Sequence, residues 1–333
     1  MTVTAGGGLE LIDAPEPPLA DGEVRVTVGC CGICGSDLHM LASPTPPVGL
    51  VLGHEFTGTV TELGHGAEEF AAGDRVAIRP LAACGECYAC GVGQPHLCER
   101  GLSRGPGLGR PGAYAQTVAV PTAMLHRLPP GVSDEHGALA EPLAVAIHGI
   151  ALAEPDARSG VWVIGAGPIG ALTAVSLRAR GIERVVVVEP NDERRAKAAA
   201  LGAAVATPEQ AEAEGAELFG GEPARIAIDC SGHPSGTPLA VRLLPAAGRL
   251  VVVGIPDGPV AVDVLALALG ELTIKGSLAY STTDFTEALE HIAAGRIPCD
   301  EIITAVAGLE EAPRRVAELR SGGTQQLKVL LRP

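Results

Sequence analysis

The sequence predicts an α/β protein with two domains, an irregular β-barrel and a doubly wound parallel sheet. Its 333 residues exceed the roughly 250–300 residues that a single core usually supports. Up to about residue 140, short strand-like stretches alternate with Gly and Pro clusters, a pattern typical of an irregular barrel. Beyond it, apolar strands alternate with helical patterns, which predicts a parallel sheet covered on both faces.

The barrel domain is expected to span residues 1–142, with a cysteine-rich lobe at 84–98. Its clearest strands are predicted at 23–28, 58–62 and 75–78. The last segment, 279–333, carries a predicted helix at 284–294 and a predicted strand at 328–331. We expect this segment to return to the first domain and complete it.

The second domain is expected to span residues 143–278, where strands and helices follow one another along the chain. Helices are predicted at 143–153, from the glycine-rich turn to 180, and around 193–201. Strands are predicted at 160–164, 185–189, 225–229 and 249–254.

Charge and composition exclude several classes of partner. The formal net charge is -15, which argues against binding to nucleic acid or to an anionic membrane, since both require a basic surface. The uncharged run 160–177 contains glycines and a proline, as expected for a buried strand, turn and helix rather than a membrane span. The amino terminus shows no signal peptide, so the nine cysteines indicate metal binding in a reducing cytoplasm.

Four cysteines form a compact set with the spacing Cys-x2-Cys-x2-Cys-x7-Cys: Cys84, Cys87, Cys90 and Cys98. Four thiolates on one short loop can close a tetrahedron around a structural Zn²⁺. An iron–sulfur cluster is the alternative, but ferredoxin runs have three residues before the fourth cysteine and a proline after it, whereas here Glu99 follows. The other cysteines without such spacing are expected to be small buried residues: Cys30, Cys31, Cys230 and Cys299.

A second, open metal site is predicted from Cys34 and His54. Thiolate and imidazole are ligands that suit zinc, and a catalytic zinc has three protein ligands and one open position. The third ligand should be a carboxylate, either Glu55 or Glu141. Taken alone, Cys34 would more often be a core residue and His54 a structural histidine, so the prediction depends on the other motifs.

A glycine-rich turn with dinucleotide-binding spacing follows the apolar strand and opens a helix. It runs Gly165-Ala166-Gly167-Pro168-Ile169-Gly170. The glycines permit a tight turn, and the helix amino terminus attracts a pyrophosphate through its free N–H groups and its dipole.

Glu189 ends the next predicted strand, nineteen residues after Gly170. A carboxylate at this position accepts hydrogen bonds from the adenine-ribose hydroxyls and repels a 2′-phosphate, so NAD is favoured over NADP. Arg194 could line the adenosine pocket or face water, and Arg195 is expected at the surface.

Together these motifs resemble the medium-chain zinc-dependent alcohol and polyol dehydrogenases, which combine a GroES-like barrel with a Rossmann domain. The resemblance runs nearly end to end and is carried by Cys34-Gly35-Ser36-Asp37-Leu38-His39, Gly53-His54-Glu55, the four-cysteine lobe, Glu141-Pro142-Leu143-Ala144, Gly165–Gly170, Glu189 and Gly276-Ser277. It implies two Zn²⁺ per chain, NAD as cofactor, a small alcohol or ketone as substrate, and a homodimer or homotetramer.

The resemblance also implies roles for single residues. Cys34 and His54 would bind the catalytic zinc, with Glu141 as carboxylate ligand and Glu55 able to exchange with it. Zinc would lower the pKa of the bound alcohol. Ser36 and His39 would form the proton relay. Val253 and Gly254 would lie at the nicotinamide carboxamide.

The segment Gly276-Ser277-Leu278-Ala279-Tyr280 narrows the substrate. Sorbitol dehydrogenases have an arginine where this chain has Ala279. The same segment, with Asp284-Phe285, resembles the 2,3-butanediol dehydrogenase branch, and Ala82 falls near a position that is bulky in ethanol-oxidising relatives. We therefore expect a small secondary alcohol or vicinal diol of the 2,3-butanediol/acetoin type. The alternatives are another polyol, an amino-alcohol or a pathway-specific alcohol, and a non-catalytic NAD- and zinc-binding protein, which the intact motifs disfavour.

Overall fold

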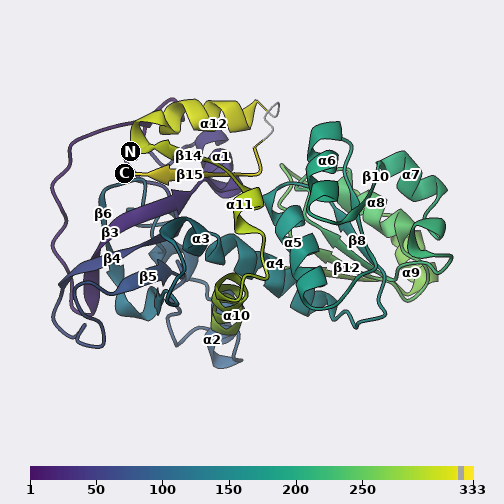
Figure 1. The fold of residues 1–333 in the computed structure, drawn as a ribbon, viewed down its shortest axis with the longest axis horizontal. Helices are drawn as coiled ribbons and strands as arrows, with labels where there is room; N and C mark the ends of the chain where they lie inside the picture. The colour runs from purple at the N-terminus through teal and green to yellow at the C-terminus, as the bar shows by residue number, and fades with distance from the viewer. Residues whose placement is uncertain (322–325) are drawn as a thin grey trace. The chain divides into compact units, whose positions relative to one another are not determined.

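The computed structural model describes residues 1–321 and 326–333 and divides into two compact units (Figure 1). The first comprises Met1–Glu141, Ser281–Ala294 and Ile303–Pro333. The second comprises Pro142–Tyr280 and Gly295–Ile302. The expected return segment, 279–333, is therefore divided, because its short stretch 295–302 belongs to the second unit.

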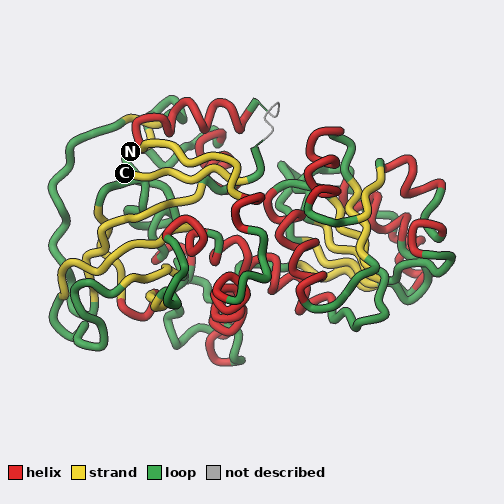
Figure 2. Tube along the Cα trace, viewed as in Figure 1, coloured by secondary structure: helices red, strands yellow, loops and turns green. Residues whose placement is uncertain are grey.

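The first unit is built on one curved sheet, with strands drawn in yellow in Figure 2. Its strands follow the order β14-β15-β3-β4-β5-β7, and β6 also pairs with β3. Their bounds are β3 Glu23–Gly32, β4 Glu55–Leu63, β5 Arg75–Ile78, β6 Thr117–Pro121, β7 Leu125–Arg127, β14 Ile303–Gly308 and β15 Lys328–Arg332. A separate two-stranded sheet joins β1 (Thr2–Val3) to β2 (Leu9–Glu10).

Strand β3 organises this unit because it pairs with β4, β6 and β15. Register shifts at Arg25/Val26 and Val28/Cys30 interrupt its ladder with β4, and such irregularities bend a strand. Both strands are longer than predicted: β3 runs on to Gly32 and β4 begins at Glu55. These two residues face each other in the ladder, so the segments carrying the candidate metal ligands meet at the end of the β3–β4 pair.

Short helices surround the sheet. They are α1 Gly35–Ala42, α2 Tyr88–Gly91, α3 Asp134–Ala138, α10 Thr282–Ala293 and α12 Ala312–Arg320, with 3₁₀ turns η1 Pro95–Leu97, η2 Leu102–Arg104, η3 Thr122–Met124 and η5 Leu309–Glu311. Helix α10 begins at a capping box between Ser281 and Asp284. It buries Phe285, whose ring lies 4.7 Å from that of His126 on β7.

The second unit is a six-stranded parallel sheet in the order β10-β9-β8-β11-β12-β13. This is the doubly wound order of dinucleotide-binding folds. The strands are β8 Val161–Ile164, β9 Val185–Val188, β10 Ala204–Ala206, β11 Ile226–Asp229, β12 Arg249–Val252 and β13 Thr273–Gly276. The helices are α4 Ala140–Ala153, which starts in the first unit, α5 Pro168–Ala179, α6 Asp192–Ala200, α7 Pro208–Ala213, α8 Gly236–Leu243, α9 Val264–Gly270 and α11 Cys299–Ile302, with η4 Glu217–Phe219.

Strand β8 lies in the middle of this sheet, and all four of its residues are buried. Val161 and Val163 join the apolar cluster on one face. Trp162 and Ile164 join the cluster on the other face. Because neighbouring side chains point to opposite faces, a strand covered by helices on both sides must be apolar throughout. Among the described residues, no helix is both long and apolar enough to cross a membrane.

Candidate functional site

Cys34, His54 and Glu55 converge at the end of the β3–β4 pair. Each can offer one ligand atom, and these atoms all lie within 4.8 Å of one another. The pairing of Gly32 with Glu55 brings the two segments together. Glycine at position 32 leaves room for this carboxylate, because a Cβ there would lie 2.1 Å from Oε2 of Glu55 and would displace that side chain. Thiolate, imidazole and carboxylate at this spacing form a donor set that fits zinc.

Asp37 contacts both Cys34 and His54 of this cluster, and the sequence alone predicted no role for it. Its buried carboxylate accepts hydrogen bonds from the Cys34 N–H (3.0 Å) and from the Tyr114 hydroxyl (2.7 Å). Its other oxygen lies 3.5 Å from Nδ1 of His54. A carboxylate behind a histidine fixes the ring so that Nε2 remains available for a metal. Asp37 lies within the motif quoted above, whereas Tyr114 gives no signal in the sequence.

Negatively charged groups in and beside this cluster change the pKa values of two neighbouring side chains. Burial by itself lowers the pKa of His54, but the charges of Asp37 and Cys34 outweigh it and raise that pKa well above its ordinary value. The neighbouring Cys31 differs: burial, together with Asp37 and Glu55, raises its thiol pKa well above the usual range. Cys31 therefore stays a buried thiol, and the sulfur that lies beside the ligand atoms of His54 and Glu55 is that of Cys34.

Lys328, on β15, brings the balancing positive charge. Its ammonium is paired with Glu55 and donates to the Ile33 carbonyl at 3.0 Å. Burial lowers the Lys328 pKa, but Glu55, Cys34 and Glu141 outweigh that effect and raise it. In the sequence, the only feature that sets Lys328 apart is its position as a single lysine at the start of an apolar strand.

The expected relay residues lie on α1. The Ser36 hydroxyl oxygen is 3.4 Å from Nε2 of His54, so it sits beside the candidate ligands. His39 is exposed in the last turn of the same helix, and residues three apart share a helix face. Glu141 is buried in the first turn of α4 but is not one of the residues whose ligand atoms lie within 4.8 Å of one another.

The four cysteines of the lobe also come together. Their sulfur atoms all lie within 4.8 Å of one another, with Cys84–Cys90 at 4.0 Å and Cys87–Cys90 at 3.5 Å. Tetrahedral zinc with Zn–S bonds of about 2.3 Å places its sulfurs about 3.8 Å apart, so the set fits that ion. Backbone N–H groups, led by that of Glu86, lower the pKa of Cys84 to about 6, which favours the thiolate.

The glycine-rich turn follows β8 in the second unit. Gly165 has a φ of +93°, and a Cβ on Gly170 would lie 1.9 Å from the Gly165 carbonyl oxygen. Gly167 caps α5 and has open space where a Cβ would be, while Pro168 occupies the first helical turn. The turn therefore leaves room at the helix amino terminus for a ligand to approach the backbone.

Glu189 is brought to this turn. Its carboxylate is buried and accepts hydrogen bonds from the backbone N–H groups of Ala166 (2.8 Å) and Asn191 (2.9 Å). Arg194 is half-buried, and its backbone N–H bonds to the cap residue Asn191. Arg195, expected at the surface, is half-buried there: its side chain is 20% exposed and donates to the Glu189 carbonyl at 2.9 Å.

Val253 and Gly254 directly follow β12. Both of their N–H groups donate to the Asp229 carbonyl at 2.9 Å, so a carboxamide placed here must use other groups. Close packing also explains the glycine, since a Cβ on Gly254 would lie 2.3 Å from the Gly232 nitrogen.

Comparison with known families gives two matches along the chain. The alcohol dehydrogenase GroES-like domain matches residues 20–130, and the zinc-binding dehydrogenase domain matches residues 168–294. A 2-dehydro-3-deoxy-L-galactonate 5-dehydrogenase from Pseudoalteromonas atlantica is 34% identical over 93% of this chain and 91% of its own length. An L-threonine 3-dehydrogenase from Streptomyces avermitilis is 33% identical over 95% and 94%, respectively.

Solved structures show the same architecture. A dehydrogenase from Escherichia coli complexed with NADH superposes with a TM-score of 0.92 at 29% identity. The 2R,3R-butanediol dehydrogenase of Bacillus subtilis gives 0.89 at 30%, and a zinc-binding dehydrogenase from Sinorhizobium meliloti bound to NADP gives 0.91 at 29%. Each comparison covers 100% of this chain and 98% of the other.

A GroES-like unit with a metal-ligand cluster, followed by a Rossmann unit with a glycine turn, defines a zinc-binding, nicotinamide-dependent oxidoreductase. The chain belongs to the medium-chain zinc-dependent alcohol and polyol dehydrogenase family. The predicted fold class is thereby confirmed. The predicted enzyme, an NAD-dependent alcohol dehydrogenase, is confirmed as an alcohol-type dehydrogenase that uses NAD or NADP.

Proposed function

We propose that the protein oxidises a small secondary alcohol or vicinal diol with NAD, and reduces the matching ketone or acyloin in reverse. The observation that carries this proposal is that Cys34, His54 and the buried Glu55 converge, with the Ser36 hydroxyl beside His54. When bound, the metal supplies Lewis-acid chemistry and the nicotinamide accepts the hydride.

Cys34, His54 and Glu141 are the proposed ligands of a catalytic zinc, and the four lobe cysteines those of a structural zinc. Glu141 is preferred to Glu55 because Glu55 is already neutralised by Lys328. Glu55 remains close enough to Cys34 and His54 to exchange with Glu141. Three protein ligands leave one position open for substrate, whereas four thiolates close the lobe site.

Ser36 and His39 are the proposed route for the substrate proton. The Ser36 hydroxyl accepts the proton that the alcohol loses, and its position beside His54 supports this role. His39 is exposed on the same helix and passes the proton to solvent, since an imidazole can both accept and donate a proton.

Glu189 supports NAD rather than NADP. Two backbone N–H groups hold its carboxylate at the glycine turn, where it can accept hydrogen bonds from ribose hydroxyls and repel a 2′-phosphate. Gly165, Gly167, Pro168, Ile169 and Gly170 would receive the pyrophosphate, with Arg194 near the adenosine and Val253 with Gly254 near the nicotinamide.

The substrate class is supported by Ala279 and Tyr280. Ala279 replaces the arginine of sorbitol dehydrogenases, so position 279 offers a long polyol no charged contact, and Tyr280 is fully buried. The butanediol dehydrogenase of Bacillus subtilis is similar along the whole chain. The alternative is another polyol or an amino-alcohol, since relatives of equal or higher identity are named for a sugar acid and for threonine.

A homodimer or homotetramer is also proposed. Helix α9 is entirely apolar apart from its last glycine, yet every one of its residues is exposed or half-buried, with Val264 at 72% and Leu269 at 78%. The neighbouring β13 is an edge strand with four exposed residues. Such surfaces normally mark protein contacts. Light scattering of the wild type and Leu269→Glu tests this, and a monomeric wild type would contradict it.

NADH formation tests the function directly. Each 2,3-butanediol stereoisomer is assayed with NAD, alongside sorbitol and L-threonine and with NADP in place of NAD. Fast, stereoselective reduction of NAD by butanediol is expected. Faster turnover of sorbitol or threonine would show that the proposed substrate is wrong and the proposed reaction class right. Inactivity of the zinc-loaded protein on every alcohol would contradict the proposal.

A further inference from the structure

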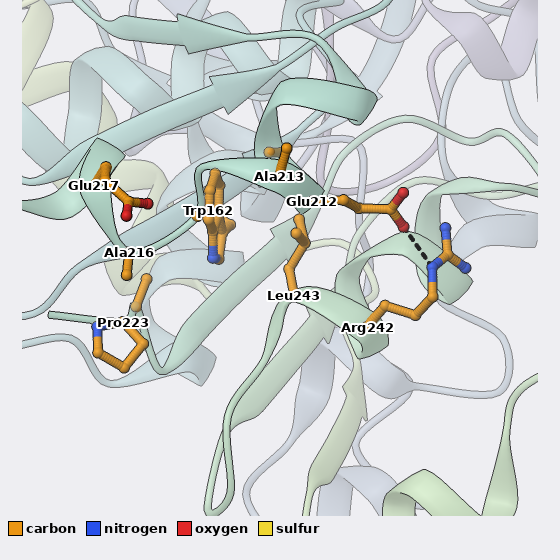
Figure 3. A pocket seen from close by; sticks show the side chains of 11 residues that line it. Trp162, Glu212, Ala213, Ala216, Glu217, Pro223, Arg242 and Leu243 are labelled. Carbon is orange, nitrogen blue, oxygen red and sulfur yellow. Dashed lines mark hydrogen bonds and ion pairs between the residues drawn. The ribbon is translucent and has the colours of Figure 1, made fainter. Parts of the chain in front are cut away.

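A cavity of about 490 Å³ lies in the second unit (Figure 3), at the opposite end of β8 from the glycine turn. It is bounded by Trp162 on β8, by α7 and η4, and by Leu243 in the last turn of α8. Trp162 is near the amino end of β8, while Gly165 follows the carboxyl end of that strand. The volume is within the range of small-molecule sites, about 300–1,000 Å³.

Trp162 supplies an unused hydrogen-bond donor at this cavity. The side chain is 1% exposed and packs edge-on against Phe219 at 4.7 Å. Within residues 1–321 and 326–333, its indole Nε1 has no hydrogen-bond partner. A buried donor left unpaired costs about 1–3 kcal/mol. Nε1 has almost no accessible surface, so an acceptor atom in the cavity reaches it only when the neighbouring side chains shift, and its hydrogen bond would then remove this cost.

The other lining groups define the rest of the ligand. Figure 3 shows the indole ring between Ala216 and Leu243, which offer apolar contact on either side. Glu212 and Arg242 neutralise each other in an ion pair at 2.6 Å. Glu217 adds a negative charge, and α8 presents its carboxyl-terminal end, where the dipole is negative. The cavity therefore disfavours anions.

We propose that this cavity binds a small neutral carbonyl compound, a ketone, ester or amide. Its oxygen accepts a hydrogen bond from the Trp162 indole, and its hydrocarbon part packs against Ala216 and Leu243. The site lies beyond the proposed function and does not depend on it, because it uses neither the metal cluster nor the glycine turn.

Trp162 is the only tryptophan of the chain, so ¹⁵N-tryptophan labelling gives a single indole N–H resonance that reports on this cavity. The full-length protein is titrated with N-methyl-2-pyrrolidinone, an amide that is neither an alcohol nor a ketone. Methylcyclopentane is the matched probe without an acceptor. A saturable downfield shift with the amide, and none with the hydrocarbon, is expected.

Two substitutions complete the test, and NADH binding confirms that each variant is folded. Ala216→Phe fills the cavity and should abolish the shift. Trp162→Phe keeps the apolar wall and should weaken amide binding about tenfold, as loss of one hydrogen bond does, measured by saturation transfer to the probe. The proposal is overturned if the amide causes no saturable shift, if the hydrocarbon shifts the resonance equally, or if Trp162→Phe binds the amide as well as the wild type.

Discussion

Lys328 and Glu55 form an ion pair that is almost completely shielded from solvent, with side-chain exposures of 2% and 1%. The two residues lie on different strands of the first unit, β15 and β4. Lys328 also feels the charges of Cys34 and Glu141. The pair therefore balances charge at the candidate metal site and engages one of its two candidate carboxylates.

Lys328→Met should destabilise the protein because it leaves the Glu55 carboxylate buried without its partner. Removing one member of a buried ion pair costs about 3–5 kcal/mol, measured by urea unfolding. Lys328→Met combined with Glu55→Gln should recover part of the loss, since no uncompensated charge remains. A double variant no more stable than Lys328→Met would show that the two residues are not coupled.

Cys34→Ala should reduce alcohol oxidation to background and lower the bound zinc by one ion per chain, while NADH binding is retained. Zinc content and NADH fluorescence measure the two effects separately. Cys31→Ala is the matched control, because Cys31 is a buried thiol three residues before Cys34, at the end of β3; it should keep its zinc and most of its activity. Full activity in Cys34→Ala would refute the ligand assignment.

Glu189→Gln should narrow the preference for NAD over NADP by about tenfold or more, or ~1.4 kcal/mol in the ratio of kcat/KM values. The substitution removes the charge that repels a 2′-phosphate and leaves Arg195 close by. Steady-state kinetics with both cofactors measure the ratio. Glu193→Gln, on the exposed side of α6, is the control and should behave as the wild type. An unchanged ratio in Glu189→Gln would exclude Glu189 from cofactor selection.

His126 should make stability depend on pH. Burial, helped by the charge of Arg79, lowers its pKa to about 4, against about 6.5 in an unfolded chain. Between pH 4 and pH 6.5 the unfolded state therefore binds more protons than the folded state. The contribution of neutral His126 to the free energy of unfolding is complete above about pH 6.5 and is lost as pH falls toward 4. Urea unfolding at pH 7 and pH 5 should show a smaller loss for His126→Phe than for the wild type. Equal losses would assign the pH dependence to other groups.

The alternation of buried strands with helices after residue 140 was sufficient to predict the parallel sheet. Strands β8 and β9 are continuous apolar runs, as burial on both faces requires. The outer strands β10 and β13 were not predicted, because they are short and carry no such run. Nor was it foreseen that 295–302 would join the second unit, since that depends on packing rather than on local pattern.

By itself, the sequence determined which ligand types are present and how they are spaced within each motif: the four lobe cysteines, Cys34 with Ser36, and the glycine turn. These are local properties, because residues close in the chain stay close in any fold. Only the tertiary structure decided that Asp37 meets Tyr114 and that Lys328 engages Glu55. Such pairings join residues far apart in the chain and are set by strand register and burial, which no local pattern encodes.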